Sequence, residues 1–389
     1  MNKLIFLCVL CMAFASCTQD NDATPQSTEG KVRLAFRVVD ALQTRADNTN
    51  TEAGWDNGWN ENKVERVDVF LFDEDGNLHK HIEKEDLNVD NATAYQTLES
   101  GLTYTELTTG TYTYYMVANC GSLENFSGKT LGALQEAMIG TPLTCNKKQF
   151  SFVMDGQGTL TKIETAKTAT LTFDLSRAAV KIRISVKDAS ASENSIIEQC
   201  TYWLCNYVSA GTFVLTPEQT EKFGDGTNQH PVISTEDMTY ADVLNYDGTQ
   251  VVFYSYPNDW FDEKKLVWDE KEEVWTITDL MKEDPIEADR QTYILLKAPY
   301  GDEEYYYKVP VNKTIYEGND AVTFTDAQLK EIRDLYRMKR NYIYDVTVKI
   351  DREGGPVTDP VTPAFYVLIN DWIQGGDYNI GAGEFVENG

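Results

Sequence analysis

The feature that most constrains the fold of this chain is the recurrence of short segments in which apolar and polar residues alternate. Residues 31–39 are an example, because Val32, Leu34, Phe36 and Val38 share one face while mostly charged residues occupy the other. Similar segments recur along the chain, separated by stretches rich in Gly, Asn and Asp that cannot continue a strand. We therefore expect a mostly β protein built from antiparallel sandwiches rather than from a parallel sheet.

The expected strands cover residues 31–39, 65–72, 101–107, 111–119, 149–154, 169–175, 178–187, 198–208, 211–215, 250–256, 265–278, 291–299, 303–309, 340–350 and 364–373. Two helices are expected, at residues 131–138 and 325–338. A chain of 389 residues forms two domains at the usual domain size. We place the N-terminal sandwich at residues 46–172 and the C-terminal sandwich at residues 173–389, which includes a Pro-rich linker at residues 351–363.

The charge of the chain excludes one class of partner. Lys and Arg number 34 against 62 Asp and Glu, which gives a formal net charge of -28 at pH 7. A surface this acidic repels phosphate backbones, so we expect no nucleic-acid partner. After residue 16, no apolar run approaches the roughly 20 residues that a membrane-spanning helix needs.

The N-terminus carries the pattern of a secretory signal. Lys3 supplies a positive charge, residues 4–14 are apolar, and two small residues precede Cys17. This ending resembles the lipobox of bacterial lipoproteins, in which the cysteine thiol is acylated and the signal is removed. The resemblance implies a signal peptide at residues 1–16 and acyl chains such as palmitate on Cys17. The lipid would tether the precursor to the outer membrane.

The remaining chemistry-bearing residues form no recognisable catalytic or metal site. After the signal and Cys17, the chain contains Cys120, Cys145, Cys200 and Cys205, which we expect to be buried thiols or to form one disulfide. The three histidines fit no zinc-ligand spacing, so we expect no metal. No nucleophile elbow, phosphate-binding loop or Ser-His-Asp spacing is present, and we expect neither catalytic residues nor a cofactor.

Three further segments occur in an order that resembles the fimbrillins, the FimA-like and Mfa-like subunits of type V pili in Bacteroidales. They are VDVFLFDEDG at residues 67–76, LSRAAVKI at residues 175–182 and RNYIYDV at residues 340–346. The resemblance implies two transthyretin-like β-sandwich domains in tandem, with a few short helices. It also implies export as a lipoprotein, association with identical or homologous fimbrial subunits, and an extracellular fimbrium that supports adhesion to a host or bacterial surface receptor.

In this family an Arg-specific protease cuts a loop after the first strand, and the C-terminal strand of a neighbouring subunit fills the groove that the first strand leaves. The resemblance implies a cut between Arg45 and Ala46, and makes residues 17–45 a lipidated spacer with a removable first strand. Loss of that strand would expose unpaired backbone groups and empty the positions of its apolar side chains. Those side chains are Val32, Leu34, Phe36 and Val38.

Residues 364–373 are the candidate donor strand. Its apolar residues are Phe365, Val367, Leu368, Ile369, Trp372 and Ile373. They occur on both faces, so the sequence leaves open which face enters the groove. A shaft role is preferred over a membrane anchor because the Arg45 site and a long C-terminal tail are both present.

Several alternatives remain open. Arg45 can be a loop arginine without a role, and residues 364–373 can pair with the sheet of their own domain. The main alternative function is a surface lipoprotein that binds a glycan or a host protein without polymerising, with Trp55 and Trp59 as candidate contacts. A secreted glycoside hydrolase is a weaker alternative.

Overall fold

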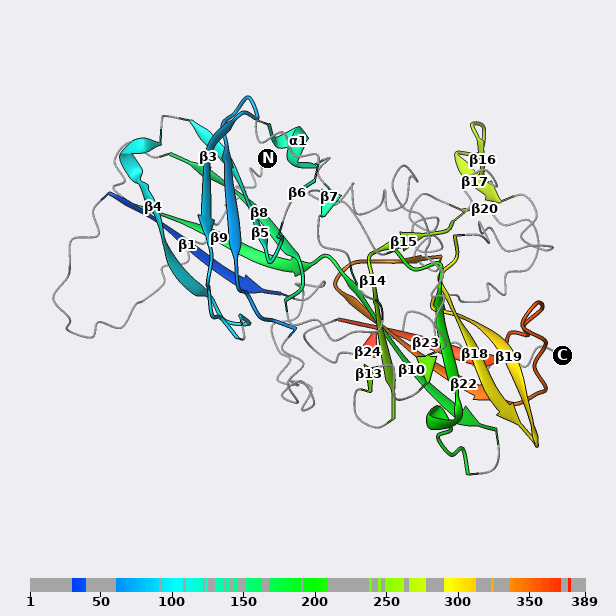
Figure 1. Ribbon diagram of the computed structural model, residues 1–389. Helices are drawn as coiled ribbons and strands as arrows, with labels where there is room; N and C mark the ends of the chain where they lie inside the picture. The colour runs from blue at the N-terminus through cyan, green and yellow to red at the C-terminus, as the bar shows by residue number, and fades with distance from the viewer. Residues whose placement is uncertain are drawn as a thin grey trace, which may run out of the picture.

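The computed structural model describes residues 30–39, 61–90, 92–107, 110–121, 123–124, 130–135, 138–139, 143, 145, 151–162, 168–189, 192–208, 238–239, 244–245, 249–261, 266–277, 290–312, 323–324, 336–371 and 377–378. Among these residues the protein is mostly β, as the alternation predicts. Its strands form two assemblies, which Figure 1 shows side by side with β9 and β10 running from one to the other.

The first assembly is a seven-stranded sheet in the order β3-β2-β5-β8-β9-β1-β4. Its strands are β1 Lys31–Val38, β2 Val67–Phe72, β3 Leu78–Lys84, β4 Gln96–Thr103, β5 Thr111–Ala118, β8 Met154–Thr161 and β9 Ala169–Arg177. A 3-10 turn, η1 Tyr104–Glu106, follows β4. Between β5 and β8 lie the short elements β6 Leu123–Glu124, α1 Leu131–Gln135 and β7 Met138–Ile139.

This sheet folds over on itself at the contact between β8 and β9. The two strands pair over only two residue pairs, near Met154 and Arg177. On the two sides of the resulting sandwich, the rings of Tyr114 in β5 and Phe173 in β9 meet edge-on with centroids 4.9 Å apart. The enclosed side chains form the first hydrophobic core.

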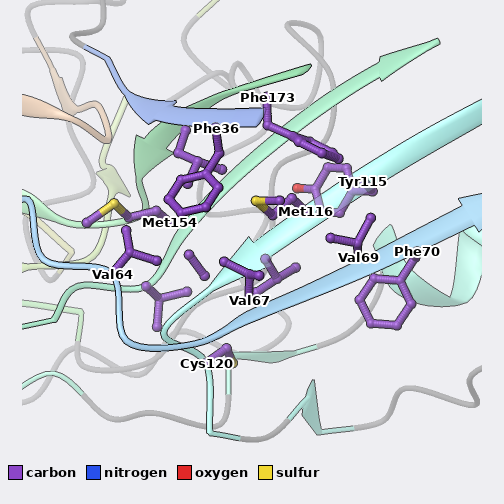
Figure 2. Packing of buried hydrophobic residues seen from close by; sticks show 14 of the residues in the cluster. Phe36, Val64, Val67, Val69, Phe70, Tyr115, Met116, Cys120, Met154 and Phe173 are labelled. Carbon is purple, nitrogen blue, oxygen red and sulfur yellow. The ribbon is translucent and has the colours of Figure 1, made fainter. Parts of the chain in front are cut away.

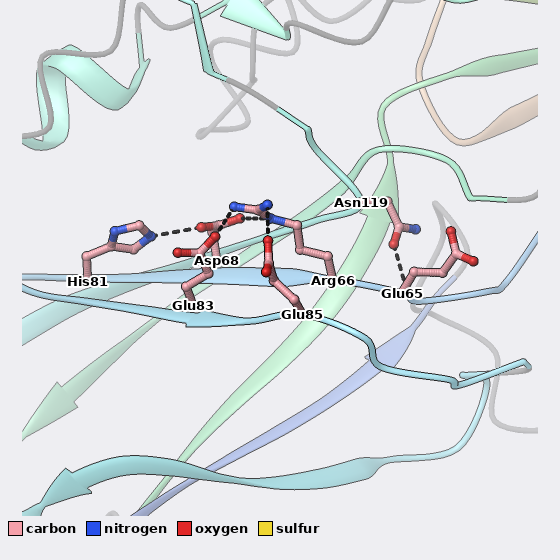
Figure 3. A network of polar contacts seen from close by, with 7 residues as sticks. All are labelled: Glu65, Arg66, Asp68, His81, Glu83, Glu85 and Asn119. Carbon is pink, nitrogen blue, oxygen red and sulfur yellow. Dashed lines mark hydrogen bonds and ion pairs between the residues drawn. The ribbon is translucent and has the colours of Figure 1, made fainter.

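The outer face of β2 carries a network of charged side chains, shown in Figure 3. Arg66 contacts three carboxylates, those of Asp68, Glu83 and Glu85, and its Nε lies 3.0 Å from Asp68 Oδ2. His81 Nε2 lies 2.8 Å from the other oxygen of Asp68. The hydrogen bond to Asp68 is the main reason that the pKa of Arg66 is raised. These contacts accommodate the Asp68 carboxylate, although the residue is only 6% exposed.

The second assembly packs a six-stranded sheet, β13-β14-β10-β22-β23-β24, with a four-stranded sheet, β12-β11-β18-β19. Its main strands are β10 Val180–Asp188, β11 Thr201–Cys205, β12 Met238–Thr239, β13 Leu244–Asn245, β14 Val251–Ser255, β18 Tyr293–Tyr300, β19 Glu303–Pro310, β22 Tyr342–Ile350, β23 Ala364–Asp371 and β24 Asp377–Tyr378. Shorter elements are η2 Ile197–Gln199, β15 Asn258–Asp259, β16 Leu266–Asp269, β17 Val274–Ile277, β20 Thr323–Phe324 and β21 Arg337–Met338. The rings of Tyr202 and Phe253 lie 6.3 Å apart in the second core.

Each main sheet contains one parallel pair of strands among its antiparallel pairs, a detail that the alternation did not predict. β1 pairs in parallel with β9, and β10 pairs in parallel with β22. Each of these first strands has an antiparallel strand on its other side, β4 for β1 and β14 for β10. The two assemblies therefore share one arrangement around their first strand.

The strand expected at residues 149–154 was misplaced, because β8 begins at Met154 and runs to Thr161. β8 contains Gly156 and Gly158, a pair of glycines that is typical of a turn when only the sequence is considered. In the fold, Gly156 permits close packing at the corner of the sandwich, since a Cβ atom there would lie 2.4 Å from the carbonyl oxygen of Asp174.

Three other expected boundaries differ from the structure. The strand expected at residues 101–107 ends at Thr103, where the backbone N–H donates to the Glu106 carboxylate at 2.7 Å and η1 begins. The helix expected to reach residue 338 is contradicted there, because β21 pairs with β15. The boundary expected between residues 172 and 173 falls within β9, and the chain changes sheet after Arg177.

Candidate functional site

β1 is an interior strand of its sheet, although it is the first strand of the chain. It pairs in parallel with β9 from Val32 to Val38, and antiparallel with β4 from Lys31 to Phe36. Its backbone therefore has hydrogen-bonding neighbours on both sides. Departure of β1 would leave a slot between β9 and β4, with a row of unpaired backbone groups on each side.

The four apolar residues of the predicted removable strand all lie in the first core. Val32, Leu34 and Phe36 are fully buried, and Val38 is 2% exposed. Figure 2 shows Phe36 inside this core close to Met154. Full burial of one such side chain contributes about 1.5–3 kcal/mol. Apolar burial is therefore a large part of what holds β1 in its slot.

The opposite face of β1 carries partly exposed ion pairs. Arg37 Nε lies 2.7 Å from Asp174 Oδ1, and the Arg37 guanidinium lies 4.6 Å from the centre of the Tyr95 ring. The hydrogen bond to Asp174 is the largest contribution to the raised pKa of Arg37. At the other end of the strand, Arg33 Nε lies 3.5 Å from Glu99 Oε1. Exposed pairs of this kind contribute little to stability.

β23, the described part of the candidate donor strand, lies beside its own second sheet. It pairs antiparallel with β22 over its whole length, while β24 pairs with it only at Ile369 and Asn370. Phe365, Val367 and Ile369 pack against the second core but are only half-buried. Leu368 is half-buried as well. In this single chain the strand therefore adopts the intramolecular pairing that the sequence left open.

A buried polar cluster joins the end of the first sheet to the start of the second. Lys181 Nζ lies 3.2 Å from Glu61 Oε1, and both side chains are fully buried. Tyr254 donates its hydroxyl hydrogen to the same carboxylate, and Arg177 Nε donates to the Glu61 carbonyl oxygen at 3.1 Å. Burial, together with the charge of Glu61, raises the pKa of Tyr254 well above its ordinary value. We refer to Glu61, Arg177, Lys181, Tyr254 and Asn341 as the junction cluster.

Asn341 connects the junction cluster to the end of β1. Its Nδ2 donates to the carbonyl oxygen of Val39 at 2.9 Å, and its Oδ1 accepts from Arg177 Nη1 at 3.0 Å. Residues 40–60, which contain the predicted cut, connect Val39 to Glu61. Of the two residues that flank this segment, Val39 contacts the junction cluster and Glu61 belongs to it.

Arg340, in the turn before β22, makes further hydrogen bonds in the same region. Its Nε donates to the carbonyl oxygen of Arg177 at 2.9 Å, and its Nη2 donates to that of Ser176. The guanidinium also pairs with the buried Asp155 carboxylate of β8, to which the Tyr115 hydroxyl donates as well. The end of β9 is thus tied to residues of both assemblies.

Sequence reasoning did not predict the junction cluster. The segments at residues 175–182 and 340–346 served only to support the resemblance, and the structure brings them together. A signal was present in β9, where Arg177 continues the inward series that includes Phe173 and Leu175. A cation on a buried strand face requires partners, because an unpaired buried charge is very costly.

Several predicted site residues lie outside the described residues. They are Cys17, Arg45, Ala46, Trp372 and Ile373, together with Trp55 and Trp59 of the alternative function. Lipidation, cleavage and the end of the donor strand therefore stay predictions.

The structure describes all four cysteines that follow Cys17. Cys120, Cys145, Cys200 and Cys205 are all buried thiols, and no disulfide occurs in the described part of the chain. Burial raises the pKa of the Cys200 thiol to about 12, which disfavours the reactive thiolate at neutral pH.

In the part of the chain that the structure describes, no group of three or more His, Cys, Asp or Glu side chains is arranged to hold a metal ion. No helix in this part is long and apolar enough to cross a membrane.

Comparison with known families places this geometry in context. Residues 31–195 match the family described as the major fimbrial subunit protein, FimA. The resemblance to the fimbrillins is confirmed. The match begins at the first residue of β1 and extends beyond β10, so it includes the slot and part of the junction cluster. The fimbrillins are structural subunits and not an enzyme family. No curated protein matches the chain.

Solved structures similar to this chain include proteins named for cell adhesion or fimbriae. A candidate cell adhesion protein from Parabacteroides distasonis matches with a TM-score of 0.50 and 13% identity, covering 90% of this chain and 99% of its own. A fimbrilin from Porphyromonas gingivalis W83 matches with a TM-score of 0.47 and 14% identity. The match covers 90% of this chain and 99% of the fimbrilin chain. The tip fimbrial protein Mfa3 from Porphyromonas gingivalis matches with a TM-score of 0.46 and 13% identity. The match covers 88% of this chain and 100% of the Mfa3 chain. At such low identity, the first of these matches supports the fold alone.

Proposed function

We propose that this protein is a fimbrial subunit that polymerises by exchange of β-strands and supports adhesion. In this proposal the precursor is exported as a lipoprotein acylated at Cys17, and an Arg-specific protease cuts it after Arg45. β1 then leaves, and the C-terminal strand of another subunit occupies its place. The subunit belongs to the shaft of the fimbrium, outside the outer membrane.

The observation that carries this proposal is the position of β1 between β9 and β4. A strand with two neighbours and a fully buried apolar face cannot leave without replacement, because both rows of backbone groups and the core would be exposed to water. A second strand supplies both kinds of interaction at once. Addition of a β-strand from another chain is an established way to pair the exposed backbone N–H and C=O groups of such a strand edge.

β23 has properties that suit a donor. It contains eight residues, as β1 does, and β24 covers only a small part of its outer edge. Phe365, Val367 and Ile369 are half-buried beside β22. Transfer into a slot like that of β1 would bury the inward-facing apolar residues more completely, so the exchange increases apolar burial for the donor strand.

The experiment that tests the proposal uses the soluble chain beginning at Thr18 and an Arg-specific protease. Mass spectrometry identifies the new N-terminus, and light scattering follows the size of the product. We expect a cut before Ala46 and growth of oligomers. The matched controls are Arg45→Ala, which should stay uncut at this site, and a chain ending at Pro363, which should be cut but should not grow.

Two results would contradict the proposal. One is resistance of Arg45 to cleavage under conditions that cut an unfolded control peptide of the same sequence. The other is a cut protein that remains monomeric after residues 18–45 have been removed. Saturable binding of a glycan by uncut protein would instead support the surface lipoprotein with Trp55 and Trp59 as contacts.

A further inference from the structure

The side-chain amide of Asn341 is fixed in one orientation at the end of the β1 slot. Its oxygen accepts two hydrogen bonds from Arg177, from the backbone N–H at 3.3 Å and from Nη1 at 3.0 Å. Its nitrogen donates to the carbonyl oxygen of Val39 at 2.9 Å. The reverse orientation would place donors against the Arg177 donors. The amide nitrogen is therefore directed at the strand in the slot.

The backbone of Asn341 is fixed as well. Its N–H donates to the carbonyl oxygen of Ala179 at 2.8 Å, and the residue is 1% exposed. Its φ of 63° lies in the left-handed region, which Asn adopts more readily than most residues. Apart from the bond to Val39, the hydrogen bonds of Asn341 are to Arg177, through the side-chain amide, and to Ala179, through the backbone N–H, and neither of these residues belongs to β1.

The group that Asn341 contacts is the backbone carbonyl of Val39, the residue directly after β1. A carbonyl oxygen is present in a strand of any sequence, so this contact does not require the side chains of β1. Asn341 can therefore accept a different strand in the same slot. Arg177 and Asn341 belong to two of the three sequence segments that carry the resemblance to the fimbrillins, and the proposed function alone gives this pair no role.

We propose that Asn341 is a positioning residue that binds the backbone at the end of whichever strand occupies the β1 slot, first β1 itself and then the C-terminal strand of a second subunit. The second part of this inference rests on the proposed function. Because Asn341 precedes β22, a residue beside the second sheet contacts the chain directly after the strand held in the first. The occupant is a β-strand of a second copy of this chain, with residues 364–373 as the binding segment.

The test compares Asn341→Asp with Asn119→Asp. At pH 7 the aspartate at position 341 can still accept from Arg177, but it presents a carboxylate oxygen to the Val39 carbonyl in place of a donor. Asn119 is a matched control because its φ is 58° and its amide also binds backbone groups, those of Lys63 and Phe152, without contacting β1. Asn341→Gly keeps the left-handed backbone and serves as a second variant if the aspartate variant does not fold.

The first measurement is hydrogen exchange on the uncut chain. We expect residues 31–39 to exchange about tenfold faster in Asn341→Asp, relative to β22 of the same protein, as loss of about one buried hydrogen bond implies. Asn119→Asp should not change this ratio. Unchanged protection of residues 31–39 with loss of protection in β22 would overturn the proposal, since Asn341 would then serve only its own sheet.

The second measurement uses a synthetic peptide of residues 364–373 and the chain cut after Arg45 and freed of residues 18–45. We expect the peptide to bind the Asn341→Asp protein about tenfold more weakly than the unsubstituted protein. Equal binding would overturn the role of Asn341 in strand exchange. If the peptide does not bind the unsubstituted cut protein, strand exchange itself fails, while the hydrogen-exchange result still decides whether Asn341 positions β1.

Discussion

β1 and β23 are similar as sequences and different as parts of the fold. Each is an eight-residue strand with apolar residues at alternate positions, and each lies near one end of the chain. β1 lies between two strands and its inward side chains are at most 2% exposed. β23 has one full-length neighbour, and its described side chains are half-buried.

The difference shows that alternation predicts a strand without predicting how tightly the strand is held. That depends on the number of neighbouring strands and on the layer that covers the apolar face. β1 has both, whereas β23 has one neighbour and a partial cover. In the proposed exchange, the strand that leaves is thus the better buried, and the candidate donor strand gives up fewer contacts in moving.

The largest effect that separates the two strands is expected from Phe36→Ala. Phe36 is fully buried in the first core, so truncation removes its burial and leaves a cavity. We expect the free energy of unfolding of the uncut chain to fall by about 3–5 kcal/mol. Urea denaturation followed by tryptophan fluorescence measures this change. A loss below about 1 kcal/mol would mean that β1 is not held by its apolar face.

A smaller effect is expected from Phe365→Ala in β23. Phe365 packs against the second core but is half-buried, so truncation removes less apolar area and the remaining space is open to water. We expect a loss of about 1–2 kcal/mol in the same urea experiment. A loss equal to that of Phe36→Ala would remove the energetic distinction between the strands.

The pH dependence of β23 provides a third comparison. Burial raises the pKa of Asp351, but hydrogen bonds from Arg352 and from backbone groups, including the N–H of Ala364 at the start of β23, outweigh burial and lower it below the ordinary value of 3.8. A lowered pKa means that the carboxylate stabilises the fold above its ordinary pKa, and that this contribution is lost as pH falls through the folded pKa.

We therefore expect hydrogen exchange in β23 to accelerate below about pH 4 relative to β22. Asp351→Asn should reduce this dependence, whereas Asp359→Asn should not, because Asp359 is exposed in the same linker. The same acid response in the Asp351→Asn protein would assign the effect to other carboxylates.

The smallest effect is expected from Glu99→Gln, which removes the partners of Lys31 and Arg33 on the exposed face of β1. Both pairs are about half exposed and their N–O distances exceed 3.4 Å. We expect a change of less than about 0.5 kcal/mol in the free energy of unfolding. A change above about 1 kcal/mol would show that charged contacts hold β1 as much as its apolar face does.

β1 and β23 were predictable as strands, whereas the pairing partners of the strands were not. Alternation locates residues 31–39, and a short apolar run after the Pro-rich linker locates residues 364–373. Neither pattern carries information on pairing partners, so the parallel pairs of β1 with β9 and of β10 with β22 were missed. β8 was misplaced because Gly156 and Gly158 resemble a turn until the strand packed against them is known.

The junction cluster was missed for a related reason. Glu61 and Lys181 are 120 positions apart, and Arg177 and Asn341 are 164 apart. A single sequence shows that Arg177 occupies an inward position, but it does not show which distant residue pairs with it. Only the folded chain brings these groups into contact.

The two-sided pairing of β1 has a mechanical consequence for a fibre built by strand exchange. Backbone hydrogen bonds in a sheet lie across the strands, so tension along a strand loads the bonds on both flanks together. Tension across an edge strand instead opens the bonds one after another. A donor strand seated as β1 is seated would therefore resist pulling in shear. Under flow, such a joint between subunits would fail only when many bonds break at once.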